Sequence, residues 1–427
     1  MSKDNKKKTE QEKTSSVDDI FSQLITQHNN KSPYSATIGT DMNSAVTHWI
    51  DSGSLLLNMI LSNKPDGGWP AGRIVEVFGK ENIGKSTLGY CAMRGCQKAG
   101  GIVIYADIER AGNPQFMEML GLDLSKTIIT YEETVETLFE ALEANLNTIA
   151  ASNKYNDKPV LIVLDSLTAL QTNSELEGGY EFNMNVSLAM AKQLGKAFKK
   201  LLPALNKANA CLYVVNQIRD NVSGYGPSYT TGGGKALKFY ASIRVYLEGK
   251  EKILVKDPVI ENEFQLAMAA WKEAGGKKSG REKPERPKMD ETTVGYTIAA
   301  YTIKNKVAPQ DRRAHFQILF SEGLKDEECY LDYAEKYGIV KKAGAYYSIV
   351  GFDNDCGKFY ASEWLQILSD HDVYSKLVAM LIDKLTIKMV GGNYVTAVEA
   401  MNEDERRIIE SLKKEQSAAE IELVNKL

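Results

Sequence analysis

The stretch Gly79-Lys80-Glu81-Asn82-Ile83-Gly84-Lys85-Ser86 has the spacing G-x-x-x-x-G-K-S, which is that of a phosphate-binding loop. The apolar, β-branched run at 73–78 before it predicts a buried parallel strand, and residues 87–98 after it predict a helix. A chance glycine-rich turn would need neither neighbour. Strand, loop and helix in this order therefore indicate a site for the phosphates of a nucleotide.

Each residue type in this loop has a chemical reason. Gly79 and Gly84 let the backbone turn tightly, so that successive N–H groups face the phosphates. Lys85 supplies a charge for the β- and γ-phosphates, and the Ser86 hydroxyl suits a Mg²⁺ ligand. The predicted ATP and Mg²⁺ site comprises Gly79, Lys80, Glu81, Asn82, Ile83, Gly84, Lys85, Ser86 and Thr87.

The composition sets the broad class of protein. A chain of 427 residues is long enough for two or three domains, and its 43% hydrophobic and 25% charged content is ordinary for a soluble globular protein. A net charge of −4 excludes nucleic-acid binding through overall charge, but not through local basic loops. The five cysteines form no C-x-x-C pair, which fits reduced thiols in the cytosol. Neither a signal peptide nor an apolar run long enough to cross a membrane is expected.

Two further apolar runs predict strands that end in carboxylates. Residues 101–107 lead to Asp107 and Glu109, and residues 159–166 have Walker-B form and place Asp165 near Mg²⁺. Ligands of open α/β sheets lie outside the carboxyl ends of the strands, so these acids can face the nucleotide. For Asp107 and Glu109, the spacing alone leaves open a helix-capping role.

A fourth strand is predicted at 210–219, and its end is polar. Gln217 in this polar end is either a γ-phosphate sensor or simply part of a polar strand terminus. The following residues, 220–235, are predicted to form a loop that combines glycines with Tyr225 and Tyr229. Such a loop suits single-stranded nucleic acid, although a purely structural loop would be equally glycine-rich. Residues 175–185 are also expected to form a loop. Residues 186–205 predict a long helix that carries Lys192, Lys196, Lys199 and Lys200.

The remaining segments suggest the domain organisation. Residues 1–46 are predicted to hold a disordered tail and a short amphipathic helix at 17–27, which must pack on its own core or on a neighbouring subunit. Residues 47–325 form the expected core, with a flexible basic insertion at 272–291 and later strands at 293–306 and 315–320. Residues 326–395 predict a small α/β domain, and 396–427 a charged helix.

Two groups of lysines in these later segments are candidates for binding anions. Lys304 and Lys306 share a strand face and are either an anion-binding pair or two solvent lysines. Lys336, Lys341 and Lys342 cluster at the first helix and turn of the small domain.

Over residues 47–385 the chain resembles the bacterial RecA recombinases, including their phage-encoded relatives. The matching motifs lie at 71–76, 107–114, 215–219, 230–234, 236–242, 304–309 and 342–348. The resemblance implies an α/β fold: a RecA-type P-loop ATPase core with a mostly parallel central sheet, an N-terminal polymerisation helix and a small α/β C-terminal domain. The insertion at 272–291 departs from the usual bacterial pattern.

The resemblance also implies roles for single residues in catalysis. Glu109 would be the general base, Asp165 would support the metal through water, and Gln217 would sense the γ-phosphate. Phe116 matches the position whose ring stacks on adenine. Lys304 and Lys306 would reach the nucleotide of the neighbouring subunit, since RecA proteins hydrolyse ATP at filament interfaces.

The same resemblance implies DNA-binding loops at 175–185 and 218–234, a small DNA-binding C-terminal domain, and an interface role for Lys238 and Phe239. The expected DNA-contacting residues are Arg219, Tyr225, Gly233, Gly234, Lys192 and Lys199. The implied protein is a cytoplasmic, DNA-dependent ATPase that forms helical filaments on single-stranded DNA and pairs it with homologous double-stranded DNA. It leaves open which loader proteins or repressors act with it. A RecA-fold ATPase without strand exchange and a hexameric ring helicase are the alternatives.

Overall fold

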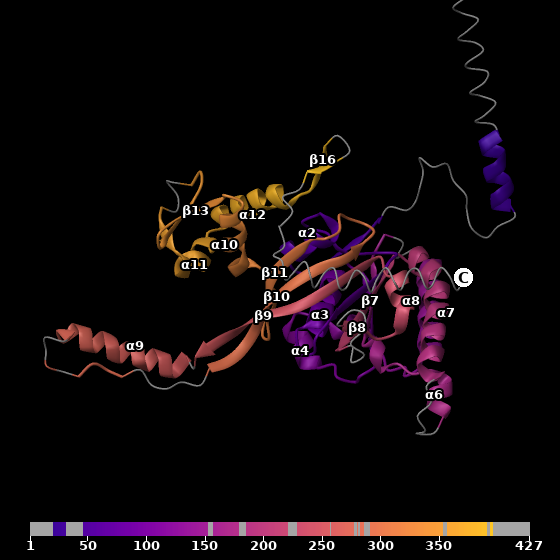
Figure 1. Cartoon of the computed structure of the whole chain (residues 1–427), viewed down its shortest axis with the longest axis horizontal. Coiled ribbons are helices and arrows are strands. Elements are labelled where there is room, and N and C mark those ends of the chain that lie inside the picture. Colours follow the sequence, from indigo (N-terminus) through magenta and orange to yellow (C-terminus); the bar gives the residue numbers. More distant parts are fainter. Residues whose placement is uncertain are drawn as a thin grey trace, which may run out of the picture. The chain divides into compact units, whose positions relative to one another are not determined.

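The strand before the phosphate loop lies in the middle of a large sheet, which contains ten strands within the described residues of this computed structural model (Figure 1). The strand order is β12 (Gly323–Lys325), β11 (Arg313–Leu319), β10 (Glu291–Asn305), β9 (Ile243–Lys256), β3 (Ile74–Gly79), β7 (Ala210–Asp220), β6 (Val160–Asp165), β4 (Ile102–Asp107) and β5 (Thr127–Thr130), with β8 (Tyr229–Thr231) paired to β7. Neighbours from β9 to β5 run parallel, and those from β9 to β12 antiparallel. The predicted α/β fold with a mostly parallel sheet is confirmed.

The structure describes residues 20–30, 46–152, 157–178, 185–220, 229–256, 258–276, 280, 282–285, 291–352, 357–390 and 393–395. The chain divides into two units, 1–46 and 47–427. In the first unit, the described residues 20–30 are helical, and the Ile20, Phe21 and Leu24 side chains are more than half exposed. Residues 17–19 of the predicted helix lie outside the described residues. The predicted tail at 1–16 and the charged helix at 396–427 lie outside the described residues.

Buried strands with apolar side chains on both faces explain why the sheet carries two cores. Along β6, Leu161 and Val163 belong to one core, whereas Ile162 and Leu164 belong to the other. This follows from the alternation of side chains along a strand. The first core includes α2 (Leu55–Ser62) and α3 (Lys85–Lys98), and the second includes α5 (Val135–Ala151), α7 (Asn185–Lys207) and α8 (Gly234–Tyr240). Among the helices of the described residues, none has the length and apolarity to span a membrane.

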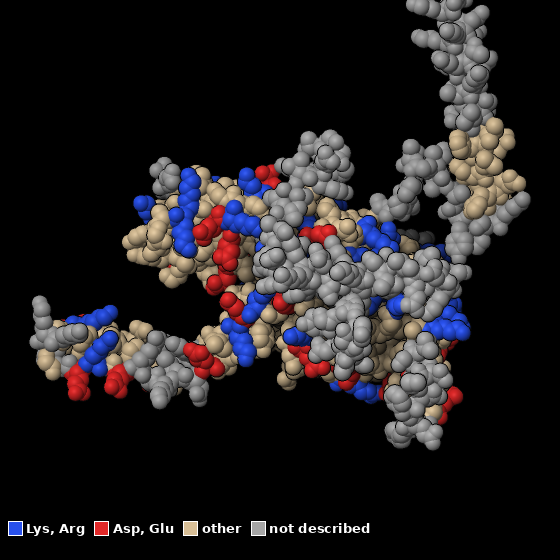
Figure 2. Space-filling view, viewed as in Figure 1, with Lys and Arg blue, Asp and Glu red and all other residues tan. Residues whose placement is uncertain are grey.

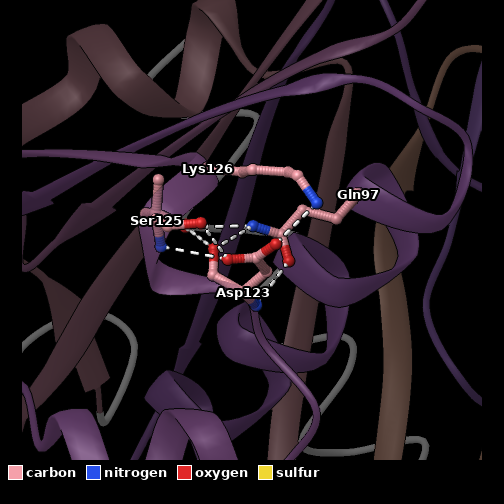
Figure 3. Close-up of polar contacts among 5 residues, drawn as sticks. Gln97, Asp123, Ser125 and Lys126 are labelled. Atoms are coloured by element: carbon pink, nitrogen blue, oxygen red, sulfur yellow. Dashed lines mark hydrogen bonds and ion pairs between the residues drawn. The ribbon is translucent and has the colours of Figure 1, made fainter.

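The end of helix α3 is tied to the turn that precedes the edge strand β5 (Figure 3). The Gln97 side chain donates to the Asp123 carbonyl at 2.8 Å and accepts from the Asp123 N–H at 3.0 Å. The Asp123 carboxylate in turn accepts from the Ser125 N–H at 3.1 Å and pairs with Lys126 at 2.6 Å. These partners hold the pKa of Asp123 below its ordinary value. The helix that begins at the phosphate loop is therefore fixed at its far end as well.

The elements after residue 325 are continuous with the first core. They are α10 (Glu327–Lys336), β13 (Val340–Ala343), β14 (Tyr346–Ile349), β15 (Phe359–Tyr360), α11 (Trp364–Leu368), α12 (His371–Leu385), β16 (Lys388–Val390) and β17 (Asn393–Val395). Leu377 and Leu381 of α12 are buried in the same core as Leu88 of α3. The Arg312 guanidinium donates to the Leu385 carbonyl at 2.8 Å. The α/β content is as predicted, and the assignment of 326–395 to a DNA-binding domain stays a prediction.

Strands β9 and β10 form a long antiparallel ribbon whose last pair is Lys256 with Glu291. Between them the structure shows helix α9 (Pro258–Glu273), where the sequence interpretation expected an insertion beginning only at 272 (Figure 1). The half-buried side chains Ile260, Phe264, Met268 and Trp271 follow the helical repeat. Residues 277–279, 281 and 286–290 of the expected insertion lie outside the described residues.

Both predicted loops contain regular structure at their ends. Residues 175–177 belong to α6 (Asn173–Glu177), because Thr172 and Glu175 form a capping box at its start. Residues 229–231 form β8, and α8 begins at Gly234, so the second loop is shorter than expected. The expected positions 179–184 and 221–228 lie outside the described residues.

Candidate nucleotide-binding active site

The phosphate loop joins β3 to α3 as the sequence predicts. Gly84 adopts φ +87°, a left-handed conformation that favours glycine, and it directly precedes the first residue of α3. The buried Lys85 side chain donates to the carbonyls of Gly79, at 3.2 Å, and Lys80. Burial lowers the pKa of Lys85, and the nearby acids Asp165, Glu81 and Glu109 oppose that shift. The ammonium group is thus held over the loop that would cradle the phosphates.

A cavity of about 710 Å³ lies over the loop. Its walls are Glu81, Asn82, Gly84, Lys85, Ser86, Thr87, Glu109, Ala111, Asp165, Ser166, Val215, Gln217, Tyr296, Ile318 and Phe320. The volume is that of a small-molecule site. The structure therefore brings Glu109, Asp165 and Gln217, each from the end of a different parallel strand, to the predicted phosphate loop. Gly79, Lys80, Ile83 and Phe116 do not line this cavity.

The two acids that follow β4 have different surroundings. Asp107 is buried, and its carboxylate accepts from the N–H groups of Ala111 and Gly112, both at 3.1 Å, so it stabilises the turn. Glu109 is exposed to the cavity and accepts a hydrogen bond from the Ser166 hydroxyl. Asp107 therefore holds the turn that follows β4 and does not cap a helix, whereas the Glu109 side chain faces the cavity.

Asp165 ends β6 at the bottom of the cavity. Burial raises its pKa to about 6, and a hydrogen bond from the Ser86 side chain opposes that shift, while Glu109 and Asp107 add to it. The Ser86 hydroxyl and the Asp165 carboxylate are therefore adjacent oxygen donors beside the phosphate loop. Hard oxygen donors are the ligands that Mg²⁺ prefers, so the residues present fit that ion.

Six residues of the cavity wall are absent from the predicted site: Ala111, Ser166, Val215, Tyr296, Ile318 and Phe320. The last three come from the antiparallel part of the sheet. Tyr296 of β10 and Phe320, just after β11, lie edge to face with ring centroids 5.8 Å apart, and Ile318 lies beside them on the cavity wall. Phe116, the predicted adenine-stacking residue, lies on α4 (Pro114–Met119) and packs edge-on against Tyr90, with centroids 6.1 Å apart. The signal for Tyr296, Ile318 and Phe320 was weak, because antiparallel pairing of distant strands brings them to the cavity.

The predicted interface residues converge on Phe239. Lys304 is buried, and its ammonium group donates to the carbonyls of Lys238 at 2.8 Å and Phe239 at 3.1 Å. Lys306 is exposed, one residue beyond the end of β10, and its ammonium group lies 6.0 Å from the centre of the Phe239 ring. Lys238 is buried beside Arg244, and desolvation with that neighbour lowers its pKa to about 8. The prediction that Lys304 and Lys306 share a strand face is therefore wrong: Lys304 is buried on β10, whereas Lys306 follows the strand and is exposed.

The predicted DNA-contacting residues are only partly described. Lys192 and Lys199 are exposed on α7, whereas Gly233 and Gly234 lie at the start of α8. Arg219 lies on β7, but its side chain, like the whole of Tyr225, lies outside the described part. Lys336, Lys341 and Lys342 are exposed, and Figure 2 shows basic side chains gathered over the region of β13 with acidic ones beside them.

Comparison with known proteins identifies the family. The RecA N-terminal domain family matches residues 25–280, which is more than half of the chain. Protein RecA of Sulfurimonas denitrificans is 33% identical over 356 residues, covering 80% of this chain and 88% of its own. Protein RecA of Nocardioides sp. is 30% identical over 339 residues (79% and 83%), and that of Helicobacter hepaticus 34% over 301 residues (70% and 74%). The chain belongs to the RecA family of DNA-dependent ATPases and has a recombinase role in DNA recombination and repair.

Proposed function

We propose that the cavity over the phosphate loop binds ATP with Mg²⁺ and hydrolyses it by water activated at Glu109. The observation that carries this proposal is the convergence of Lys85, Glu109, Asp165 and Gln217 around one cavity. Lys85 would bind the β- and γ-phosphates, and Gln217 would contact the γ-phosphate. When bound, Mg²⁺ would neutralise phosphate charge. Ser86 and Asp165 are the residues that would hold it.

In this mechanism, Glu109 accepts a proton from the water that attacks the γ-phosphate. Its carboxylate is already oriented, because Oε1 accepts from the Ser166 hydroxyl. Ser166 also lies within hydrogen-bond distance of Thr168, with their hydroxyl oxygens 2.8 Å apart. These contacts hold the Glu109 carboxylate at the cavity wall, from which it would activate the attacking water.

We further infer that the protein assembles as a filament on single-stranded DNA in the cytoplasm and pairs that strand with homologous double-stranded DNA. The chain between β7 and β8, which follows Gln217, would contact DNA. Lys306, exposed beside Phe239, would reach the nucleotide of the next subunit, and Lys304 would have to leave its two carbonyl partners to do the same. DNA affinity would rest on backbone phosphates and fall with rising salt.

The test is ATP hydrolysis by the purified protein with and without an oligo-dT strand. We expect DNA to stimulate hydrolysis strongly, because β7 carries Gln217 of the nucleotide cavity and leads into the segment that would contact DNA. If the protein hydrolyses ATP at the same rate with and without DNA, the recombinase mechanism is contradicted. The assignment of the phosphate-binding loop would still hold. Electron micrographs that show closed rings on DNA would favour a ring helicase instead.

A further inference from the structure

Three side chains, one carboxylate and two hydroxyls, form a short series of hydrogen bonds beside the cavity. The Ser166 hydroxyl donates to Oε1 of Glu109, and its oxygen lies 2.8 Å from the hydroxyl oxygen of Thr168. Glu109 and Ser166 line the cavity, whereas Thr168 is not one of its wall residues. Thr168 is therefore connected to the nucleotide site through the Ser166 hydroxyl.

The direction of these hydrogen bonds follows from the number of protons. Glu109 acts as a base in its carboxylate form, which has no proton to donate, so Ser166 gives its single hydroxyl proton to Glu109. The contact between Ser166 and Thr168 then requires the proton of Thr168. Consecutive hydrogen bonds polarise one another, so the bond from Thr168 strengthens the bond from Ser166 to Glu109.

Ser166 can take part in this series because its side chain does not cap the helix that follows. It occupies the N-cap position of the short helix η3 (Leu167–Ala169), where a serine hydroxyl commonly accepts from a backbone N–H of the first turn. Within the described residues, η3 has no such capping hydrogen bond. The buried Ser166 hydroxyl is directed instead to Glu109 and Thr168.

The side chain of Thr168 is held in one orientation by its surroundings. Leu167 and Leu170, on either side of it in the sequence, are buried in the second core and anchor the backbone of η3. A Cβ added at Gly232 would lie 2.2 Å from the Thr168 methyl carbon, so this methyl group packs against the Gly232 backbone. The methyl group thus faces Gly232 while the hydroxyl faces Ser166. A β-branched side chain with both γ substituents in contact keeps a single rotamer.

We propose that Thr168 is a positioning residue for the general base Glu109 and acts on it through Ser166. This inference rests on the proposed function, in which Glu109 accepts a proton from the attacking water. Because Ser166 occupies Oε1, the second carboxylate oxygen is the one that meets this water. A base that is already in place needs no reorganisation in the transition state. Thr168 should therefore contribute to the rate of hydrolysis and not to nucleotide affinity.

The test compares kcat and KM for ATP among Thr168 variants of the full-length protein, by phosphate release with oligo-dT present. Thr168→Val has nearly the same shape but no hydroxyl, so we expect kcat to fall about tenfold and KM to stay within about twofold. Thr168→Ser keeps the hydroxyl, so its kcat should stay within about threefold of wild type. A role of the methyl group in packing alone predicts the opposite order, with Thr168→Val the more active variant.

Three further variants separate the hydroxyl from other effects. Thr168→Ala also lacks the hydroxyl, needs no space for a second methyl group, and should lose kcat as Thr168→Val does. Thr148→Val on α5 is the matched control, because its exposed hydroxyl bonds only to the Ala144 carbonyl. In the Glu109→Gln background, adding Thr168→Val should slow hydrolysis by no more than about twofold, because the carboxylate through which Thr168 acts is gone.

Wild-type kcat in both hydroxyl-free variants overturns the positioning role, and so does a Thr168→Ser variant as slow as Thr168→Val. A loss of about tenfold on adding Thr168→Val to Glu109→Gln also overturns it, because Thr168 would then act independently of the base. Failure of the proposed function gives a different result, since Glu109→Gln would then hydrolyse ATP at the wild-type rate.

Discussion

Lys85 illustrates how one buried charge serves a phosphate site. Its ammonium group is held by two carbonyls of its own loop, and burial lowers its pKa. Replacing it should remove the attraction for the β- and γ-phosphates. We expect Lys85→Ala to lower kcat/KM for ATP at least about a hundredfold, measured by phosphate release. Lys98→Ala, at the far end of the same helix, is the control. Turnover close to wild type would contradict the phosphate-loop assignment.

Glu109 should behave as a base rather than as a structural acid. Glu109→Gln keeps the shape and the contact with Ser166, so we expect ATP-analogue affinity and filament assembly to remain. The hydrolysis rate should fall between about a hundredfold and ten-thousandfold, because the amide cannot accept the proton from water. Glu118→Gln on α4 is an exposed control with the same chemical change. If Glu109→Gln hydrolyses ATP at the wild-type rate, the Glu109 carboxylate does not accept the proton from water.

Residue types and spacing were enough to find the phosphate loop and the acids at the carboxyl ends of β4 and β6. They could not separate Asp107 from Glu109, because the difference lies in which N–H groups surround each carboxylate. They also missed Tyr296 and Phe320, which reach the cavity only through the pairing of β10 with β11. Contacts that depend on the register between distant strands leave no local pattern in the sequence.

At the scale of elements, the start of helix α2 depends on a carboxyl group that follows β12. The Asp326 side chain accepts from the Ser54 hydroxyl at 2.6 Å and from the Leu56 N–H at 3.1 Å. Complete burial raises its pKa from 3.8 to about 7, although these hydrogen bonds oppose the shift. The folded protein therefore binds this proton more tightly than the unfolded chain. Its contribution to stability is present below pH 3.8 and is lost as the pH rises to about 7.

We therefore expect Asp326→Asn to become more stable relative to the wild type as the pH rises from 5 to 7. The relative gain in the free energy of unfolding should be on the order of 1 kcal/mol or more. Urea unfolding at several pH values measures it. Asp123→Asn is the control, because the pKa of that exposed carboxyl is lowered and its contribution is instead lost as the pH falls. Parallel pH profiles for wild type and Asp326→Asn would contradict this assignment.

The central strands were predictable because buried parallel strands are continuous apolar runs, as in Val160–Asp165. Helix α6 was missed although Thr172 and Glu175 carry a capping signal, because the glycines that follow favoured a loop. Helix α9 was also missed. Its half-buried apolar side chains follow a helical repeat, but α9 belongs to neither of the two cores of the sheet, so no packing pattern with other elements marked it.

At the scale of the molecule, the segment that connects β9 to β10 and contains α9 should be dispensable for folding. The pair Lys256–Glu291 closes the ribbon, so residues 257–290 can be replaced by Asn-Gly, a favoured two-residue hairpin turn. We expect the melting temperature to change by no more than about 2 °C, because α9 contributes to none of the described cores. ATP-analogue binding should be retained. Scanning calorimetry checks the first result, and a loss of several degrees would show that α9 packs on the core.

The same ribbon continues directly from the strand beside the phosphate loop. The first residues of β9 pair with β3, ending at Leu247 opposite Gly79, and the later residues pair only with β10. Because β11 pairs with β10 as far as Gly295, which lies opposite Ile253, the ribbon is two-stranded only in its outermost pairs. A force on this outer part would pass through the three-stranded stretch that follows Leu247 to the strand pair that ends at Gly79. A load on the assembled protein would thus act on phosphate binding mechanically, without a change in any residue of the loop.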